Sequence, residues 1–415
     1  FNGRFVINGQ EMPDSLFGWI RRTAKENPNF IVSAYKDNVA FVQGPAAYQF
    51  APEQQDTASW FNAREIPTVL SLKAETHNFP TTVEPFNGAA TGTGGEIRDR
   101  MAGGQGSFPV AGTAVYMTSY SRLEERRLWE RHTRPRAWLY QEPVEILIKA
   151  SNGASDFGNK FGQPLICGSL LTFEMQTGDR LYGYDKVIML AGGVGYGNAD
   201  QSLKKDPKKG DRVIVMGGDN YRIGMGGGAV SSVATGEYGR MVELNAVQRS
   251  NPEMQKRVYN AIRAMAESRR NPIVSVHDHG AGGHLNSLSE LVEVTGGHID
   301  LRKLPVGDPT LSAREIIGNE SQERMGLVIT PEDEEYLRNV AERERAPLYD
   351  VGEVSGDQRF LVYDAQTDRA PIDLHLADMF GKPPRTELID SDIPIVLSDL
   401  HADVSRIGDY LKDVL

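Results

Sequence analysis

The pattern of apolar and polar residues predicts strands and helices in alternation along the chain. Between residues 68 and 75, apolar side chains alternate with polar ones, so Lys73 and Glu75 would share one face of a strand. His77 would join that face if the chain stays extended. A cation, a carboxylate and an imidazole at a strand end could form a reaction cluster or a solvated sheet face, and the spacing leaves both interpretations open.

Helix signals accompany these strand patterns. Ser15 is a favoured N-cap for a helix with apolar residues at helical spacing. Asn251 and Pro252 indicate a second helix start, because Asn caps well and Pro suits the first helical position. Strands are predicted at residues 187–191, 212–216 and 272–276. The whole pattern favours an α+β chain of two domains that join near residues 185–205.

Composition narrows the classes of function. The 415 residues include 45 Lys and Arg and 56 Asp and Glu, a formal net charge of −11, and so acidic a chain is a poor binder of nucleic acid. No apolar run approaches the roughly 18 residues of a membrane span, so neither a nucleic acid nor a membrane is an expected partner. The chain begins at Phe1 rather than Met, which indicates a segment of a longer protein.

The single cysteine bears on location and packing. Cys167 excludes an internal disulfide and fits the reducing cytoplasm, where we expect the protein. Its apolar neighbours Leu165 and Ile166 predict a place in the core.

The arginines between residues 122 and 136 predict a solvated insertion, although that stretch could also bind an anion.

Glycine is the compositional anomaly, with 43 of 415 residues against a usual share of about 7%. Residues 88–99 combine four glycines with small residues and end in Arg98 and Asp99. We predict a glycine-rich loop whose backbone N–H groups approach phosphate oxygens. Arg98 could bind phosphate and Asp99 could bind Mg²⁺. The spacing is neither a P-loop nor a dinucleotide fingerprint.

The second half repeats this combination of glycine and polar residues. Residues 224–232 could place a phosphate at a helix N-terminus or form a packing contact. Three histidines, His277, His279 and His284, could indicate a zinc hydrolase, but they lack a helical metal-ligand spacing. Asp278 as a Mg²⁺ ligand at a strand end is the preferred interpretation. Residues 319–322 could bind a ligand or form a turn.

Six of these segments together resemble one family, phosphoribosylformylglycinamidine synthase. The matching segments are KAETHNFPTTVEPFNGAATGTGGEIRD (residues 73–99), ASNGASDFGNKFGQP (150–164), GMGGGAVSS, VQRSNPEM, HDHGAGG and NESQER. The resemblance runs from Phe1 to about residue 384. It corresponds to the first of two homologous synthetase halves in the long form of the enzyme, which is related to aminoimidazole ribonucleotide synthetase. The second half and the glutaminase domain are not in this sequence.

The resemblance implies a two-domain synthetase half. Residues 1–190 would form the N-terminal domain, which pairs into a β-barrel with a homologous half. Residues 191–385 would form a C-terminal mixed α/β domain, and residues 386–415 a linker or helical tail. Because the second half is missing, we expect two copies of this chain to form a homodimer through their N-terminal domains.

The resemblance also implies a reaction and its cofactors, ATP and Mg²⁺. Formylglycinamide ribonucleotide, ATP and ammonia would become the amidine, ADP and phosphate, with the ammonia supplied by a glutaminase domain outside this chain. ATP would phosphorylate the amide oxygen, which ammonia then displaces. Two alternatives are a nucleotide-binding scaffold without turnover and, more remotely, the zinc hydrolase.

Residue roles follow from the same resemblance. His77 matches the proton acceptor, and Glu75, Asp99 and Asp278 match metal-binding carboxylates. The positions that match substrate contacts are Thr76, Asn78, Arg98, Gln248, Glu320, Ser321 and Gln322. The positions that match the ATP-binding segment are Lys73, Gly88, Ala89, Ala90, Thr91, Gly92, Thr93, Gly94, Gly95, Glu96, Ile97, Arg98 and Asp99. Phe79 departs from the family, which usually has a second histidine there, and His279 receives no role.

Overall fold

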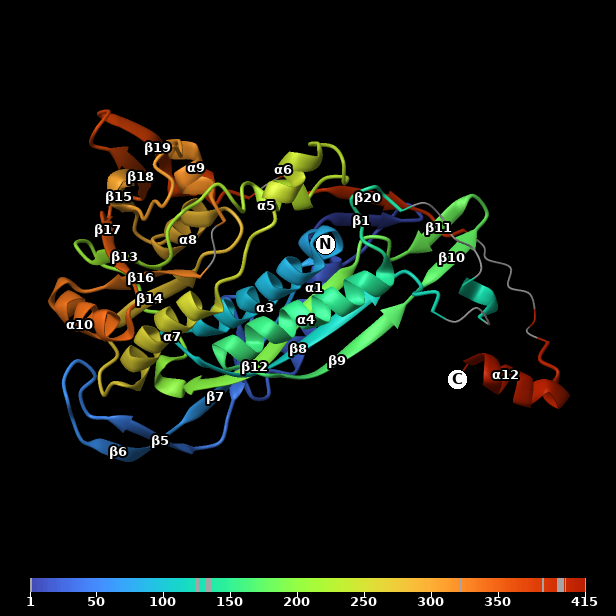
Figure 1. The fold of residues 1–415 in the computed structure, drawn as a ribbon, viewed down its shortest axis with the longest axis horizontal. Helices are drawn as coiled ribbons and strands as arrows, with labels where there is room; N and C mark the ends of the chain where they lie inside the picture. Colours follow the sequence, from blue (N-terminus) through green and yellow to red (C-terminus); the bar gives the residue numbers. More distant parts are fainter. Residues whose placement is uncertain are drawn as a thin grey trace. The chain divides into compact units, whose positions relative to one another are not determined.

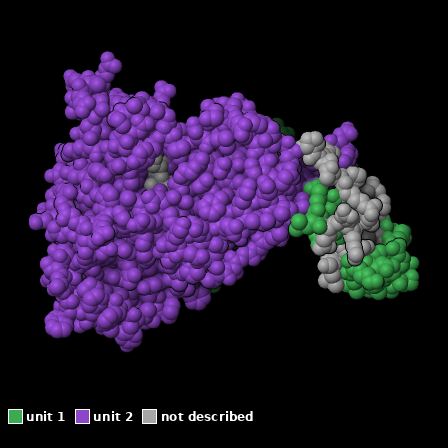
Figure 2. All heavy atoms as spheres, in the orientation of Figure 1, with its two compact units in different colours: residues 1–29, 122–134, 381–415 green, residues 30–121, 135–380 purple. Residues whose placement is uncertain are grey.

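The structure is a computed structural model that describes residues 2–123, 127–130, 136–320, 323–382, 384–393, 399 and 401–414. The chain divides into two compact units (Figure 2). The minor unit comprises residues 1–29, 122–134 and 381–415, and the main unit comprises residues 30–121 and 135–380. Every described residue of the predicted site belongs to the main unit.

The minor unit contains a small sheet and the first predicted helix. Its strands are β1 (Arg4–Ile7), β2 (Gln10–Glu11) and β20 (Glu387–Asp390), and its helices are α1 (Leu16–Glu26), η1 (Leu128–Glu130), η5 (Val404–Arg406) and α12 (Ile407–Val414). Ser15 caps α1 as predicted, because its Oγ accepts a hydrogen bond from Gly18 N at 3.0 Å. Most of the arginine-rich stretch, including residues 124–126 and 131–135, lies outside the described residues.

The first sheet of the main unit has six strands in the order β3-β4-β7-β12-β8-β9. Their bounds are β3 (Ile31–Ser33), β4 (Ala40–Gln43), β7 (Thr68–Thr76), β12 (Ile188–Asn198), β8 (Phe108–Thr118) and β9 (Leu165–Thr172). Helices α3 (Pro85–Met101) and α4 (Pro143–Phe161) pack together and contact this sheet (Figure 1). The predicted strand at residues 68–75 is confirmed as β7. Two hairpins, β5–β6 (Ala47–Pro52, Phe61–Ile66) and β10–β11 (Glu174–Thr177, Arg180–Gly183), complete this part.

The second sheet has seven strands in the order β14-β16-β13-β17-β15-β18-β19. Their bounds are β14 (Ile273–Asp278), β16 (Arg324–Ile329), β13 (Arg212–Gly217), β17 (Leu348–Val354), β15 (Gly297–Asp300), β18 (Arg359–Asp364) and β19 (Arg369–His375). Ile214 and Met216 pack with α7 (Pro252–Glu267) and α10 (Glu334–Glu344), whereas Val213 and Val215 pack with α8 (Gly283–Leu291) and α9 (Ala313–Gly318). The sheet is therefore covered on both faces, which its continuous apolar strands require.

Shorter helices connect these strands. They are α2 (Asn78–Val83), α5 (Gly227–Ser231), α6 (Arg240–Asn245), α11 (Leu376–Met379), η2 (Ala199–Gln201), η3 (Leu301–Lys303) and η4 (Pro331–Asp333). The predicted start of α7 is confirmed, because the Asn251 side chain accepts from Met254 N at 3.1 Å and Pro252 is the first helical residue.

The predicted glycine-rich loop at residues 88–99 is wrong, because this segment lies inside helix α3. Glycine is a poor helix former, but here tertiary packing decides. A Cβ on Gly88 would lie 2.3 Å from the carbonyl carbon of Pro80, and one on Gly94 would lie 2.7 Å from the Phe157 ring. The glycines therefore permit close packing of α3. The backbone N–H groups within the helix are engaged, so the predicted phosphate nest does not form.

The predicted position of Cys167 in the core is also wrong, because Cys167 is exposed. Strand β9 is the last strand of its sheet, so Cys167 stays exposed although its neighbours along the sequence are apolar.

The expected domain boundary near residue 190 falls inside β12, while the two sheets separate between Asn198 and Arg212. One buried cluster joins both sheets, and the division into residues 1–190, 191–385 and 386–415 stays a prediction.

Candidate functional site

A cavity of about 400 Å³ in the main unit brings together ten of the predicted site residues. We call it the central cavity. The predicted residues that line it are Glu75, Thr76, His77, Asn78, Thr91, Gly95, Arg98, Gln248, Asp278 and Glu320. They come from β7, α2, α3, β14 and the connections of the second sheet, so the fold unites segments that lie far apart in the sequence.

Strand β7 and helix α3 position the first group of side chains. Lys73 and Glu75 share a face of β7, as the alternation predicts, and Lys73 Nζ lies 3.7 Å from Glu75 Oε2. The glycines of α3 make room for this group. A Cβ on Gly95 would lie 2.4 Å from Glu75 Oε1, and one on Gly92 would lie 2.9 Å from the Cβ of His77. The glycines of residues 88–99, which the sequence analysis interpreted as phosphate-binding, therefore leave space for the side chains of Glu75 and His77.

His77 follows β7 and occupies the N-cap position of α2. Its Nδ1 lies 2.6 Å from Gly88 O, and because a carbonyl can only accept, Nδ1 carries the proton and Nε2 is left as an acceptor. Burial, with a smaller contribution from Arg98, lowers the pKa of His77 to about 4. The imidazole is therefore neutral near pH 7, as a proton acceptor must be.

Three carboxylates meet at one side of the central cavity. Lys73 Nζ lies 2.8 Å from Asp99 Oδ2. Asn38 Nδ2 donates to Asp99 Oδ1 at 3.1 Å and to Asp278 Oδ1 at 2.6 Å. Together with Glu75, these contacts confirm that the three acids converge. No sequence pattern pointed to Asn38 as part of this group.

The electrostatics of this acid cluster (Glu75, Asp99 and Asp278) reflect burial first and repulsion between neighbouring acids second. Burial, and then the neighbouring Asp99, raises the pKa of Glu75 to about 8. Burial, and then Asp278, raises the pKa of Asp99 to about 6. Such oxygen donors suit Mg²⁺. Among the described residues, however, no group of three or more His, Cys, Asp or Glu side chains is arranged to hold a metal ion, so the magnesium assignment stays a prediction.

Glu320 joins the two glycine-rich connections of the second half. Its carboxylate accepts from Gly228 N at 2.8 Å, Gly282 N at 3.2 Å and Gln248 Nε2 at 3.1 Å. Burial raises the pKa of Glu320, and these three donors oppose that shift. Gln248 keeps a buried Oε1 without a hydrogen-bond partner. Ser321 and Gln322, also predicted to contact substrate, lie outside the described residues.

Other predicted residues have structural partners. Asn78 Oδ1 accepts from Met189 N at 3.1 Å, so this side chain anchors β12 while it lines the cavity. Glu96 and Arg100 form a buried ion pair within α3, with Arg100 Nη2 2.5 Å from Glu96 Oε2. Of the predicted ATP-binding segment, only Thr91, Gly95 and Arg98 line the central cavity; the predicted contact of the segment with ATP stays a prediction.

A second cavity, of about 610 Å³, lies beside the acid cluster, and we call it the lysine-lined cavity. Its lining includes Lys36, Lys204 and Lys205 as well as Lys73 and Asp99. Lys73, Glu75 and Asp99 contact one another, although Lys73 and Asp99 line this cavity and Glu75 lines the central one. The lining of this second cavity also includes five acidic residues, so its charge is mixed. The acid cluster therefore stands at the boundary between this cavity and the central cavity, which holds His77.

The three histidines considered for zinc all have protein partners. His277 Nε2 lies 2.5 Å from Glu290 Oε2. His279 Nε2 lies 2.9 Å from His284 Nδ1, and Arg324 Nη1 donates to His284 Nε2 at 2.7 Å. Burial holds the pKa values of His279 and His284 well below the usual range. Both rings are thus part of the interior, and this arrangement does not support the zinc alternative.

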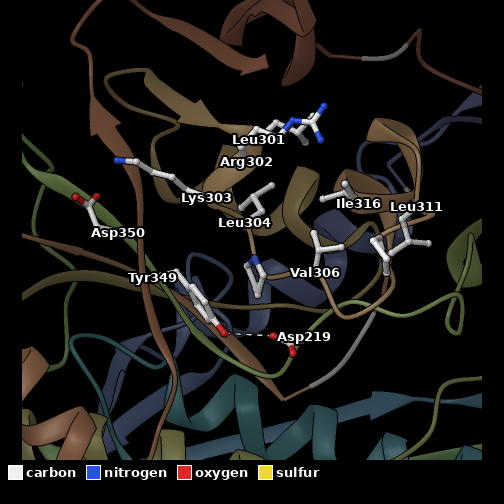
Figure 3. A pocket seen from close by; sticks show the side chains of 12 residues that line it. Asp219, Leu301, Arg302, Lys303, Leu304, Val306, Leu311, Ile316, Tyr349 and Asp350 are labelled. Carbon is white, nitrogen blue, oxygen red and sulfur yellow. Dashed lines mark hydrogen bonds between the residues drawn. The ribbon is translucent and has the colours of Figure 1, made fainter. Parts of the chain in front are cut away.

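A larger cavity, of about 720 Å³, lies beside the second sheet (Figure 3). Its floor is apolar, with Leu304 and Ile316 buried, and Tyr349 OH donates to Asp219 Oδ1 at 3.2 Å. None of the predicted site residues lines it.

Comparison with known proteins shows what this chain is similar to. Residues 208–364 match the family described as AIR synthase related protein, C-terminal domain. Phosphoribosylformylglycinamidine synthase of Dictyostelium discoideum is 40% identical over 400 residues, 94% of this chain. The human protein of that name is 39% identical over 420 residues, 96% of this chain. The chain is a relative of the phosphoribosylformylglycinamidine synthases. The resemblance predicted from the motifs is therefore confirmed.

Solved structures extend the relationship to the fold. T. maritima PurL complexed with FGAR matches 81% of this chain and 48% of its own length, with a TM-score of 0.61 and 24% identity. The same protein complexed with ATP gives a TM-score of 0.59 and 22% identity. These matches show a mixed α/β fold like that of PurL. The chain spans only 29% and 31% of the Dictyostelium and human synthases.

Proposed function

We propose that this chain is the first synthetase half of a phosphoribosylformylglycinamidine synthase. It would convert formylglycinamide ribonucleotide, ATP and ammonia to formylglycinamidine ribonucleotide, ADP and phosphate in purine biosynthesis. The observation that carries this proposal is the central cavity, where a neutral imidazole, two cations and the acid cluster converge. The similarity to synthases of that name supports it.

The two cavities suggest how the substrates are divided. ATP would place its phosphates in the lysine-lined cavity, whose lining includes Lys36 and Lys205 besides the paired Lys73 and Lys204. The substrate amide would occupy the central cavity, so that its oxygen meets the γ-phosphate at the acid cluster. Phosphoryl transfer needs little covalent help from a protein, because positioning and charge neutralisation dominate. The two cavities beside one acid cluster provide both.

The acid cluster is the metal site that we propose, although its three acids are not arranged to hold a metal ion in this structure. Glu75, Asp99 and Asp278 would hold Mg²⁺, which neutralises the phosphate charge that develops during transfer. Burial, and then repulsion from a neighbouring acid, raises the pKa values of Glu75 and Asp99, and a bound cation would relieve that repulsion. Lys73, between two of these acids, offsets part of it.

His77 would accept a proton when ammonia displaces the phosphorylated oxygen. The addition of ammonia creates an acidic ammonium group, so even an imidazole with a low pKa can take its proton. The hydrogen bond from Nδ1 to Gly88 O holds the ring and leaves Nε2 to act. A glutaminase domain outside this chain would supply the ammonia.

The first sheet supports pairing with a homologous half. Leu72 of β7 and Val194 of β12 are register partners, and each is 42% exposed. Leu70 is 40% exposed. An apolar sheet face that is open to water favours burial against another protein surface. In the absence of the second half, a second copy of the chain would form an isologous dimer through this face and bury more than about 1,000 Å².

Location and partners complete the proposal. No helix among the described residues is long and apolar enough to cross a membrane. The protein would act in the cytoplasm, without nucleic acid or membrane as partner. Light scattering at micromolar concentration should show the dimer, and a monomer would refute the pairing.

The reaction is tested in the full-length protein with ammonium as the nitrogen donor. Phosphate release from ATP should require both formylglycinamide ribonucleotide and ammonium, and Arg98→Met should reduce it. Lys25→Met, on exposed α1, serves as the matched charge-removing control. The proposed function of this cavity would be refuted if phosphate release did not depend on the ribonucleotide, or if Arg98→Met released phosphate at an unchanged rate.

A further inference from the structure

Lys186 places an ammonium group on the wall of the central cavity, just before β12. The segment that carries it is held against α2. Val187 N donates to Thr82 Oγ1 at 3.0 Å, and Met189 N donates to Asn78 Oδ1 at 3.1 Å. The position of Lys186 is therefore set by the fold and does not depend on a mobile connection.

The surroundings of this ammonium group leave its charge largely uncompensated. Lys186 Nζ lies 5.5 Å from the ring centroid of buried Phe79 and donates to Ser231 O at 3.3 Å. Among the described ion pairs, none joins Lys186 to a carboxylate within 4.0 Å. Burial lowers the pKa of Lys186, and the more distant Glu243 opposes that shift. A partly buried cation without a counter-ion is costly unless a ligand compensates it.

Arg98 gives the same cavity a second cation of this kind. Its Nη1 donates to the neutral Gln255 Oε1 at 2.9 Å, and no carboxylate forms an ion pair with it within the described part of the chain. Lys73 differs, because Asp99 and Glu75 neutralise it. The backbone of Gly227 and Gly228 also lines the cavity, although the N–H of Gly228 already donates to the Glu320 carboxylate. The two cations, Lys186 and Arg98, therefore favour an anion in this cavity.

We propose that Lys186 binds the phosphate monoester of the ribonucleotide substrate. This inference rests on the proposed function and extends it to one further residue. An ammonium group offers three donors and a point charge, which suit a terminal phosphate. The Phe79 ring supports the ammonium group through a cation–π contact.

The test compares a ligand with and without its phosphate. Formylglycinamide ribonucleotide and the corresponding dephosphorylated ribonucleoside are titrated calorimetrically into the full chain. Lys186→Met removes the charge and keeps an apolar stem, Lys186→Arg keeps the charge, and Lys160→Met removes an exposed, paired lysine as the control. Circular dichroism confirms that each variant is folded. ADP with Mg²⁺ is titrated in parallel.

We expect Lys186→Met to weaken binding of the ribonucleotide about 10- to 100-fold, the usual effect of losing one hydrogen bond to a charged group. Binding of the ribonucleoside and of ADP should change less than about twofold, and Lys186→Arg should retain most of the affinity. If Lys186→Met weakened binding of the ribonucleotide and the ribonucleoside equally, the phosphate contact would be refuted while the proposed function would stand. If it weakened binding of ADP instead, Lys186 would belong to the nucleotide site, and the phosphate contact would again be refuted. No binding of the ribonucleotide by the unsubstituted chain would overturn this inference together with the proposed function.

Discussion

Replacing Gly88 with alanine separates the structural from the phosphate-binding interpretation of the glycine-rich segment. An added Cβ would lie 2.3 Å from Pro80 C, 2.4 Å from Thr81 N and 2.5 Å from Pro80 O. All three are backbone atoms, so no side chain can rotate away. Helices α2 and α3 must then move apart, although both belong to a buried and closely packed region.

Two opposing effects set the magnitude. Alanine favours a helix over glycine by about 1 kcal/mol, whereas overpacking a close contact costs about 1–3 kcal/mol. Since the contact atoms are backbone, the upper part of that range applies. We therefore expect Gly88→Ala to lower the free energy of unfolding by about 2 kcal/mol. The same shift would disturb Gly88 O, the acceptor for His77 Nδ1.

The assay is urea unfolding followed by circular dichroism, with Gly318→Ala as the matched control. Gly318 is the last residue of α9, and an added Cβ there would meet nothing within 4 Å. That variant should be unchanged or slightly more stable. A Gly88→Ala chain as stable as the unsubstituted one would refute the close packing of α3 and revive the loop interpretation.

Three further predictions follow from the same region. In the full-length protein, His77→Ala should lower turnover about 10²- to 10⁴-fold while ADP binding persists, because only the proton acceptor is lost; near-normal turnover would leave His77 a structural role. The pKa of Glu75 is raised in the folded state, so the folded state binds a proton that the unfolded state has lost, and the free energy of unfolding should fall as pH rises from about 4.5 toward 8. Melting temperatures of Glu75→Gln should fall less over this pH range. An identical pH dependence in the two proteins would contradict the raised pKa of Glu75. Arg100→Leu breaks a fully buried pair with Glu96 and should cost about 3–5 kcal/mol in urea unfolding, whereas the exposed control Lys160→Met should cost little.

Sequence alone determined the local elements and the motif order. The alternation over residues 68–75 placed Lys73 and Glu75 on one face, because strand side chains repeat every second residue. Ser15 and Asn251 marked helix starts correctly, because a cap depends on neighbours within three residues. The motif letters were sufficient to indicate the relatives.

Only the tertiary structure decided how those segments meet. Helix α3 forms despite its glycines, because packing against α2, α4 and the site side chains outweighs weak local propensity. Cys167 is exposed because β9 ends its sheet, a fact of strand order that no neighbour along the chain encodes. Asn38 donates a hydrogen bond to Asp278, 240 residues along the chain. Lys186 and Phe79 are likewise distant in the sequence but in contact in the fold. Contacts between distant segments depend on the whole fold, so local pattern could not predict them.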